Sequence, residues 1–280
     1  MSEDNRQERL VRSPVFILSP MRSGSTLLRV LLNSHSMIRA PHEMHLRTLQ
    51  VDFGEFYTEL AIQRLDLTRT ELEYLLWDRL LHRELARSGK QIIVDKTPGN
   101  VLAWRRLHAC WPEARYVFLL RHPASVLAST LEVSRAQLQR MAEIMRDRDG
   151  EGAMASFTAD GGGTLPADLD MSGMMTQIVL GHIQGLNEAM STLSGLSVRY
   201  EELVRDPARV TQGVCSFLGV PWEPQMLDYG RYDHGPFEVF VGDFTEKIRS
   251  GRVREARPLP TGDAIPEPLR EACLGWAYEV

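Results

Sequence analysis

The chain has 280 residues, of which 43% are hydrophobic and 25% charged, and its formal net charge is −5 at pH 7. This length suits one large α/β domain, or one domain with a helical annex, and the apolar content suffices for a sizeable core. The acidic balance argues against nucleic acid as a partner, no apolar run approaches a membrane span, and the polar start does not resemble a signal peptide. We therefore expect a cytoplasmic protein.

The first predicted elements are a buried strand at 15–19, a tight polar loop and a helix at about 25–34. The loop reads Arg22-Ser23-Gly24-Ser25-Thr26. Strand, loop and helix in this order form a phosphate cradle, because consecutive backbone N–H groups converge on an anion at the positive end of a helix. The Walker pattern needs a glycine where this chain has Ser19 and a lysine where it has Ser25, and here the basic residue comes before the turn. The loop therefore fits a phosphate-like group but not ATP with magnesium.

A second candidate anion site follows the next predicted helices and strands. One or two helices are expected between residues 55 and 87, then a short buried strand at 91–95 and a helix at 99–110. A buried parallel strand follows at 114–120 and ends at Arg121, where a nucleoside triphosphatase would carry an aspartate for its metal.

Arg121-His122-Pro123 opens a helix that we expect to run from about residue 124 to residue 148. Ser129 lies eight residues after Arg121, about two helical turns along. An arginine and a hydroxyl at this spacing can hold a second phosphate. Two anion sites without a metal aspartate suggest a nucleotide that carries phosphates at two ends of its ribose.

The remaining pattern completes the fold prediction. Glycines and a proline interrupt regular structure at 150–166, a helix resumes near 174–194, and a strand follows at 196–200. Strands that alternate with helices predict an α/β fold: a P-loop-like three-layer sandwich with a central parallel sheet, helices on both faces and a helical annex. We find no repeat or linker, so we expect a single domain over 1–280 with a flexible tail at 1–12. The three cysteines lack metal-ligand spacing, so we expect buried, reduced thiols and no metal.

These motifs resemble those of the sulfotransferases that use 3′-phosphoadenosine 5′-phosphosulfate (PAPS). The family's 5′-phosphosulfate loop is similar to Pro20–Thr26, with Met21 inserted, and its 3′-phosphate motif is similar to the Arg121 and Ser129 pair. Later landmarks are similar to residues 200–222, and the loop that closes over the nucleotide is similar to 247–253. The resemblance covers most of the chain. It implies that the following residues bind the nucleotide: Arg22, Ser23, Gly24, Ser25, Thr26, Arg121, Ser129, Tyr200, Ser250, Gly251 and Arg252.

The spacing from Arg22 to Glu43 resembles the branch that contains tyrosylprotein sulfotransferases and bacterial natural-product sulfotransferases, including domains inside polyketide synthases. In that branch a glutamate at this place is the catalytic base. The resemblance therefore implies that Glu43 is the general base and that Arg22 and Lys96 act on the transferring group. His42 and His45 flank Glu43, and either could be the base instead or could line the substrate site.

The expected function is transfer of the sulfuryl group of PAPS to a hydroxyl of a small or medium-sized metabolite, such as a natural-product intermediate, without a metal. Two alternatives remain open. A P-loop kinase or NTPase is disfavoured by the missing Walker lysine and metal aspartate, and a non-catalytic nucleotide-binding module would bind the nucleotide without turnover. The sequence does not specify the acceptor, whether it is carried by another protein, or the oligomeric state.

Two segments are expected to be mobile and to control access to the site. The glycine-rich stretch 150–166 is expected to border the acceptor pocket. The basic stretch 243–260 carries five lysines and arginines around Ser250-Gly251, and it is expected to close over the 3′-phosphate, since clustered positive charge is naturally ordered by an anion.

Overall fold

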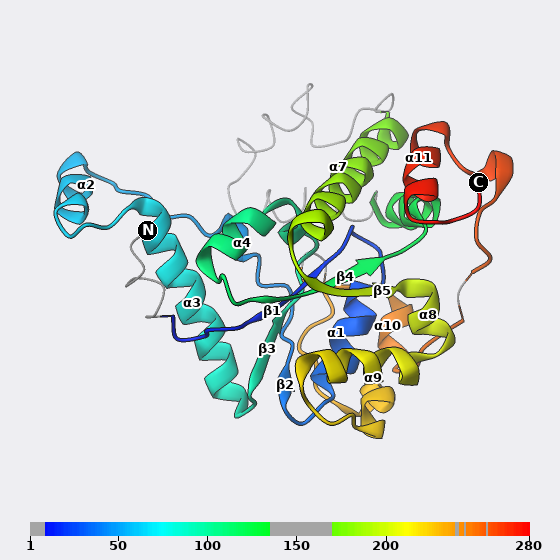
Figure 1. Cartoon of the computed structure of the whole chain (residues 1–280), viewed down its shortest axis with the longest axis horizontal. Coiled ribbons are helices and arrows are strands. Elements are labelled where there is room, and N and C mark those ends of the chain that lie inside the picture. Colours follow the sequence, from blue (N-terminus) through cyan, green and yellow to red (C-terminus); the bar gives the residue numbers. More distant parts are fainter. Residues whose placement is uncertain (1–8, 135–169, 239–240, 244, 256) are drawn as a thin grey trace.

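A five-stranded parallel sheet with the strand order β2-β3-β1-β4-β5 lies at the centre of the computed structural model (Figure 1). The structure describes residues 9–134, 170–238, 241–243, 245–255 and 257–280. The strands are β1 (Val15–Leu18), β2 (Ile38–Arg39), β3 (Ile92–Asp95), β4 (Arg115–Leu120) and β5 (Gly195–Arg199).

Both faces of the sheet are buried, as the apolar strands require. In β1, Phe16 and Leu18 belong to one hydrophobic cluster, whereas Val15 and Ile17 belong to another, and all four side chains are fully buried. Because successive residues of a strand point to opposite faces, the two clusters are the two layers on either side of the sheet. β4 alternates between the same clusters.

Helices supply the rest of each cluster. The first cluster is formed with α3 (Arg69–Ser88), α4 (Trp104–Cys110), α7 (Met171–Thr192) and α11 (Glu267–Gly275). The second is formed with α1 (Ser25–Asn33), α8 (Tyr200–Arg205), α9 (Pro207–Leu218), α10 (Glu246–Arg249) and the 3-10 helix η4 (Pro224–Arg231). Figure 1 shows α4, α7 and α11 on one side of the sheet and α1 and α9 on the other. The predicted parallel sheet with helices on both faces is confirmed.

Several element boundaries differ from the prediction. The stretch 55–87 forms two helices, α2 (Phe56–Gln63) and α3, and 99–110 forms the 3-10 helix η3 (Pro98–Leu102) followed by α4. β2 was not predicted, because a two-residue strand is too short to show a period. Residues 123–134 are helical, as expected.

Other predictions can be compared with the structure only in part, because some of their residues lie outside the described ranges. The end of the helix predicted to reach residue 148 and the whole stretch 150–166 lie outside the described residues. At the chain start, residues 1–8 also lie outside them, but Leu10 and Val11 donate backbone N–H bonds of 2.7 and 3.1 Å to the Asp78 carboxylate. The three cysteines are buried free thiols. Within the described part of the chain, no helix is long and apolar enough to cross a membrane.

The strand order determines where polar residues gather. In parallel strands the carboxyl ends lie at one edge of the sheet, and ligands bind there where the chain crosses from one half of the sheet to the other. β1 pairs with β3 on one side and β4 on the other. The residues that follow these strands, and β5, are therefore brought to a common edge: the Arg22 loop, Lys96, Arg121 and Tyr200.

Candidate functional site

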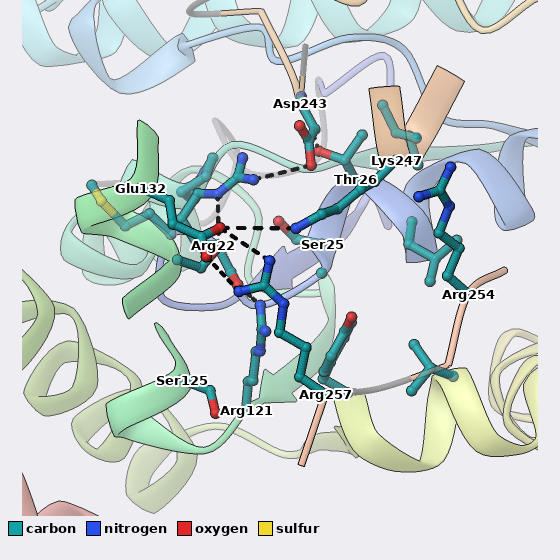
Figure 2. A pocket seen from close by; sticks show the side chains of 18 of the residues that line it. Arg22, Ser25, Thr26, Arg121, Ser125, Glu132, Asp243, Lys247, Arg254 and Arg257 are labelled. Atoms are coloured by element: carbon teal, nitrogen blue, oxygen red, sulfur yellow. Dashed lines mark hydrogen bonds and ion pairs between the residues drawn. The ribbon is translucent and has the colours of Figure 1, made fainter. Parts of the chain in front are cut away.

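A cavity of about 590 Å³ lies at this edge of the sheet (Figure 2). Among the described residues, seven arginines and lysines and five acidic residues line it, so its lining has a net positive charge suited to an anionic ligand. Ten of the residues predicted for the site line the cavity: Arg22, Gly24, Ser25, Thr26, Glu43, His45, Arg121, Ser129, Tyr200 and Arg252.

The loop after β1 has the backbone of an anion cradle. Arg22 and Gly24 both adopt left-handed conformations, with φ of 60° and 83°. At Gly24 a Cβ atom would lie 2.3 Å from Cδ2 of Tyr200, so the aromatic ring requires a glycine there. Gly24 provides no side-chain cap for α1, which leaves the first N–H groups of that helix for a ligand. Ser23 is fully buried and does not line the cavity.

Arg22 connects the two predicted anion sites. Its Nε lies 3.4 Å from the Ser129 hydroxyl, and its Nη2 lies 3.3 Å from the Asp243 carboxylate. Figure 2 shows the Arg22 guanidinium turned toward Asp243. The first loop and the helix after β4 therefore face the same space.

Arg121 is held where the second site was predicted. Its Nη1 donates to the Arg22 carbonyl at 2.5 Å, and its guanidinium lies 4.3 Å from the centroid of the Tyr200 ring. Burial lowers the pKa of Arg121, but an arginine remains a cation. Ser125 and Ser129, one turn apart on the helix at 123–134, line the cavity beside it. This set can bind an anion through a charged fork and two hydroxyls.

The carboxylate of Glu201 holds the turn after β4 in place. One oxygen of this carboxylate accepts the His122 backbone N–H at 3.0 Å, and the other accepts the Tyr278 hydroxyl at 2.8 Å. Glu201 therefore links the turn that begins at Arg121 to Tyr278 near the end of the chain. No local sequence pattern reveals this contact.

Glu43 and Lys96 form an ion pair at the wall of the cavity. Lys96 is 1% exposed and donates to the Glu43 carboxylate and, at 3.2 Å, to the Thr26 hydroxyl. Burial lowers the pKa of Lys96, and the Glu43 carboxylate opposes that effect. Lys96 lies behind the wall rather than on it, whereas the Glu43 side chain, 12% exposed, lines the cavity.

The two histidines beside Glu43 have different positions. His45 lines the cavity, and its Nε2 lies 3.7 Å from the Glu43 carboxylate. His42 does not line it, and its Nδ1 lies 3.0 Å from the backbone carbonyl of Glu43. Of the two, only His45 can meet a ligand in this cavity.

His182 is a cavity residue that the sequence analysis did not find. Its Nδ1 accepts the Met21 backbone N–H at 3.3 Å, so the proton of the neutral ring sits on Nε2. Burial, and secondarily the charge of Arg47, lower the pKa of His182 to about 4. His182 is therefore a neutral hydrogen-bond donor and not a base. It lies on α7, far along the chain from its partner, and no local pattern marks it.

The C-terminal basic segment reaches the cavity through its arginines. Arg252, Arg254 and Arg257 line it. Glu132 pairs with Arg257 and, at 3.8 Å, with Lys247, and Figure 2 shows both basic side chains directed toward it. The helical position of Glu132, three residues after Ser129, could have identified it.

Besides Ser23, two residues predicted to contact the nucleotide, Ser250 and Gly251, do not line the cavity. Ser250 donates its hydroxyl to the Lys247 carbonyl at 2.7 Å, and Gly251 packs so closely on Gly230 that an added Cβ would lie 2.8 Å from its Cα. The Tyr229 hydroxyl lies between the carbonyls of Ile248 and Arg252, at 3.2 and 3.1 Å, and its single proton can be shared between them. In this arrangement Ser250 and Gly251 shape the segment that carries Arg252.

Comparison with known proteins identifies the family of the chain. The model of the sulfotransferase family matches residues 14–161, which is more than half of the chain. The chain belongs to the sulfotransferase family. The resemblance drawn from the motifs is thereby confirmed at the level of the family.

One relative of the chain is the nodulation protein NoeE of Sinorhizobium fredii (strain NBRC 101917 / NGR234), to which it is 33% identical over 127 residues. The match covers 41% of this chain but only 30% of that protein.

Two solved structures resemble the whole chain. The sulfotransferase domain from the curacin biosynthetic pathway is 22% identical, with 96% of this chain and 99% of that chain covered and a TM-score of 0.62. The sulfotransferase domain from the Synechococcus PCC 7002 olefin synthase is 21% identical, with 98% of each chain covered and a TM-score of 0.54. At these identities the likeness shows a common fold.

The low pKa of His182 predicts a pH-dependent stability. The pKa falls from 6.5 to about 4 on folding, so between these values the unfolded chain binds a proton that the folded protein does not. The free energy of unfolding should therefore decrease as the pH falls through this window, by up to about 3 kcal/mol. His182→Gln keeps an acceptor for the Met21 amide and removes the titration. Urea unfolding across this window should show a shallower pH dependence for the variant, and parallel curves would contradict the assignment.

Proposed function

We propose that this protein transfers a sulfuryl group from PAPS to a hydroxyl group of a small or medium-sized metabolite. The observation that carries the proposal is the meeting of two cationic anion sites and the Glu43 carboxylate in a single cavity. The loop at 22–26, the Arg121 set and Glu43 come from separate strand ends, yet all line the same space. Membership of the sulfotransferase family supports the same chemistry.

The residues present fit PAPS. The left-handed loop and the uncapped start of α1 suit the 5′-phosphosulfate, since they offer backbone N–H groups to oxygen atoms. Arg121, with Ser125 and Ser129, suits the 3′-phosphate through charge-assisted hydrogen bonds. Lys247, Arg252 and Arg257 add positive charge to the lining. Bound PAPS would supply the sulfuryl group.

Arg22 and the loop amides would act on the charge that develops during transfer. Sulfuryl transfer resembles phosphoryl transfer, in which negative charge spreads over the peripheral and leaving oxygens. Donors fixed in advance stabilise that charge without reorganising. The guanidinium of Arg22 is already turned into the cavity by Ser129 and Asp243. An arginine does not release its proton, so its contribution is electrostatic.

Glu43 is the proposed general base. Its carboxylate faces the cavity, and Lys96 holds it in place from the buried side while also binding Thr26 in the phosphosulfate loop. The ammonium of Lys96 thus links the base to the donor site, so the acceptor oxygen and the loop keep a constant separation. His45, 3.7 Å from the same carboxylate, is the alternative base that the cavity admits.

The rival functions fit less well. Magnesium-dependent ATP chemistry would require a lysine at Ser25 and an aspartate after β4, where this chain has Arg121. Asp243 and Glu132 pair with arginines of the lining, whereas Lys96 holds Glu43 toward the cavity, and a module that only binds nucleotide would not need Glu43 there.

Nucleotide binding tests the donor site. We expect 3′-phosphoadenosine 5′-phosphate to bind much more tightly than AMP, without magnesium, because only the former reaches Arg121 with a phosphate. Arg121→Ala should remove most of that difference, on the order of 10- to 100-fold in Kd, since a charge-assisted contact contributes about 1.5–3 kcal/mol. Arg209→Ala, which removes an exposed arginine on α9, is the matched control and should bind like the wild type. Equal affinities of the wild type for the two nucleotides, measured by calorimetry, would contradict the assignment of PAPS as the donor.

Turnover tests the base. Glu43→Gln preserves shape and should lower sulfuryl transfer from PAPS by roughly a hundredfold or more while nucleotide affinity changes little. Thermal unfolding of the nucleotide-bound variant checks that Lys96 remains accommodated. His42→Gln should keep activity, because His42 lies outside the cavity. Normal turnover by Glu43→Gln together with an inactive His45→Gln would move the base to His45.

A further inference from the structure

Part of the cavity lining has no role in the proposed donor site. It comes from the loop after β1, from the 3-10 helix η2 (Leu46–Thr48), from η3 and from α7. These elements touch one another: Met21 donates to His182, and the His45 backbone N–H donates to the Thr97 hydroxyl at 3.3 Å. The residues of this wall, here called the η2 wall, are Met21, His45, Arg47, Pro98, Gly99 and His182.

Arg47 is a charged group of the η2 wall that pairs with no anion among the described residues. Its residue is partly buried, and its buried Nε has no hydrogen-bond partner. Among the residues that the structure describes, no carboxylate pairs with its guanidinium: Glu43 is taken by Lys96, and Glu73 is taken by Arg106. A partly buried cation without a counter-ion is costly, so its retention in a cavity indicates a ligand that supplies the charge.

The wall is shaped to hold Arg47 in place. A Cβ atom at Gly99 would lie 2.3 Å from the Arg47 Nε and 2.9 Å from its Nη2, so the guanidinium packs directly on the glycine. The carbonyl of Arg47 accepts a bond from Arg106 at 3.5 Å. The neighbouring His182 is neutral, so it brings no negative charge and offers a second donor.

The positive charge of Arg47 is separate from the charge needed by the donor. The proposed nucleotide site uses Arg22, Arg121 and the basic C-terminal segment, which come from other elements. Arg47 instead follows Glu43 by four residues and shares its wall with His45, the neighbour of the proposed base. An anion bound at Arg47 would therefore belong to the molecule whose hydroxyl approaches Glu43.

We propose that the acceptor carries an anionic group, a carboxylate or a phosphate, near the hydroxyl that is sulfated, and that Arg47 binds this group. The proposal rests on the proposed sulfuryl transfer and specifies its substrate class: hydroxylated acids rather than neutral alcohols or amines. Arg47 selects the acceptor through a charge-assisted hydrogen bond, and His182 offers a neutral donor beside it.

Matched acceptors test this assignment. The panel pairs aliphatic hydroxy acids of increasing chain length, and 4-hydroxyphenylacetate, with their primary amides, and adds the corresponding phosphate monoesters of diols. With PAPS and wild-type protein, we expect the acids or the phosphates to exceed the amides in kcat/KM by roughly 10- to 100-fold, the range expected of a charge-assisted contact. Whether carboxylates or phosphates react faster identifies which anion the site takes.

Variants locate the preference at Arg47. Arg47→Met should remove it by lowering kcat/KM for the anionic members while that for the amides stays unchanged, and Arg47→Lys should restore part of it. Arg105→Met, which removes an exposed arginine paired with Glu188, is the control and should keep the preference. Equal turnover of acids and amides by the wild type would overturn the proposal. So would an equal loss for acids and amides in Arg47→Met, which would place Arg47 on the sulfuryl group.

A binding measurement separates failure of this proposal from failure of the sulfotransferase function. Calorimetry of the same acids and amides with protein saturated in 3′-phosphoadenosine 5′-phosphate needs no turnover. Tighter binding of the acids, lost in Arg47→Met, supports the anionic acceptor even if no sulfuryl transfer occurs. Failure of the acids to bind more tightly than the amides overturns it, even if PAPS is consumed with some neutral acceptor.

Discussion

The parallel pairing of β1 with both β3 and β4 is the constraint on which the rest of the site depends. The register places Phe16 opposite Asp95 on one side and Leu18 opposite Phe118 on the other. Lys96, the Arg22 loop and Arg121 must then emerge at one edge, although they are separated widely in the sequence. The buried apolar layers on both faces stabilise this pairing, so the chemistry of the cavity follows from the packing of the sheet.

Electrostatic pairing then gives each group at that edge a distinct place. Lys96 lies behind the wall, where it pairs with Glu43 and donates to Thr26, so its buried ammonium joins the carboxylate to the loop at 22–26. The acidic side chains of Asp243 and Glu132 pair with cations that line the same cavity. An anionic nucleotide would compete with these carboxylates for Arg22 and Arg257, and this competition is a reason for the donor site to use several arginines rather than one.

The fold and much of the site could be predicted from the sequence because the signals are local. Apolar runs ending in polar residues identified β1, β3 and β4, and the residues just past them were the candidate ligands. β2 was not predicted because a strand of two residues is too short to show a periodic pattern of apolar residues. Glu201, His182 and Arg47 were missed as site residues because their positions depend on tertiary contacts with the turn after β4, with the Met21 amide and with Gly99. Ser250 and Gly251 were placed on the nucleotide by resemblance alone; neither lines the cavity, and Gly251 packs on Gly230.

The central claim, that one cavity holds both ends of a bisphosphorylated nucleotide beside Glu43, is tested most directly by a crystal structure with 3′-phosphoadenosine 5′-phosphate. The account predicts the 5′-phosphate on the backbone N–H groups of residues 22–26 and the 3′-phosphate on Arg121 and Ser129, with the Glu43 carboxylate facing the end from which the sulfuryl group departs. A nucleotide bound with its 3′-phosphate away from Arg121, or with its 5′-phosphate off the loop, would contradict the account.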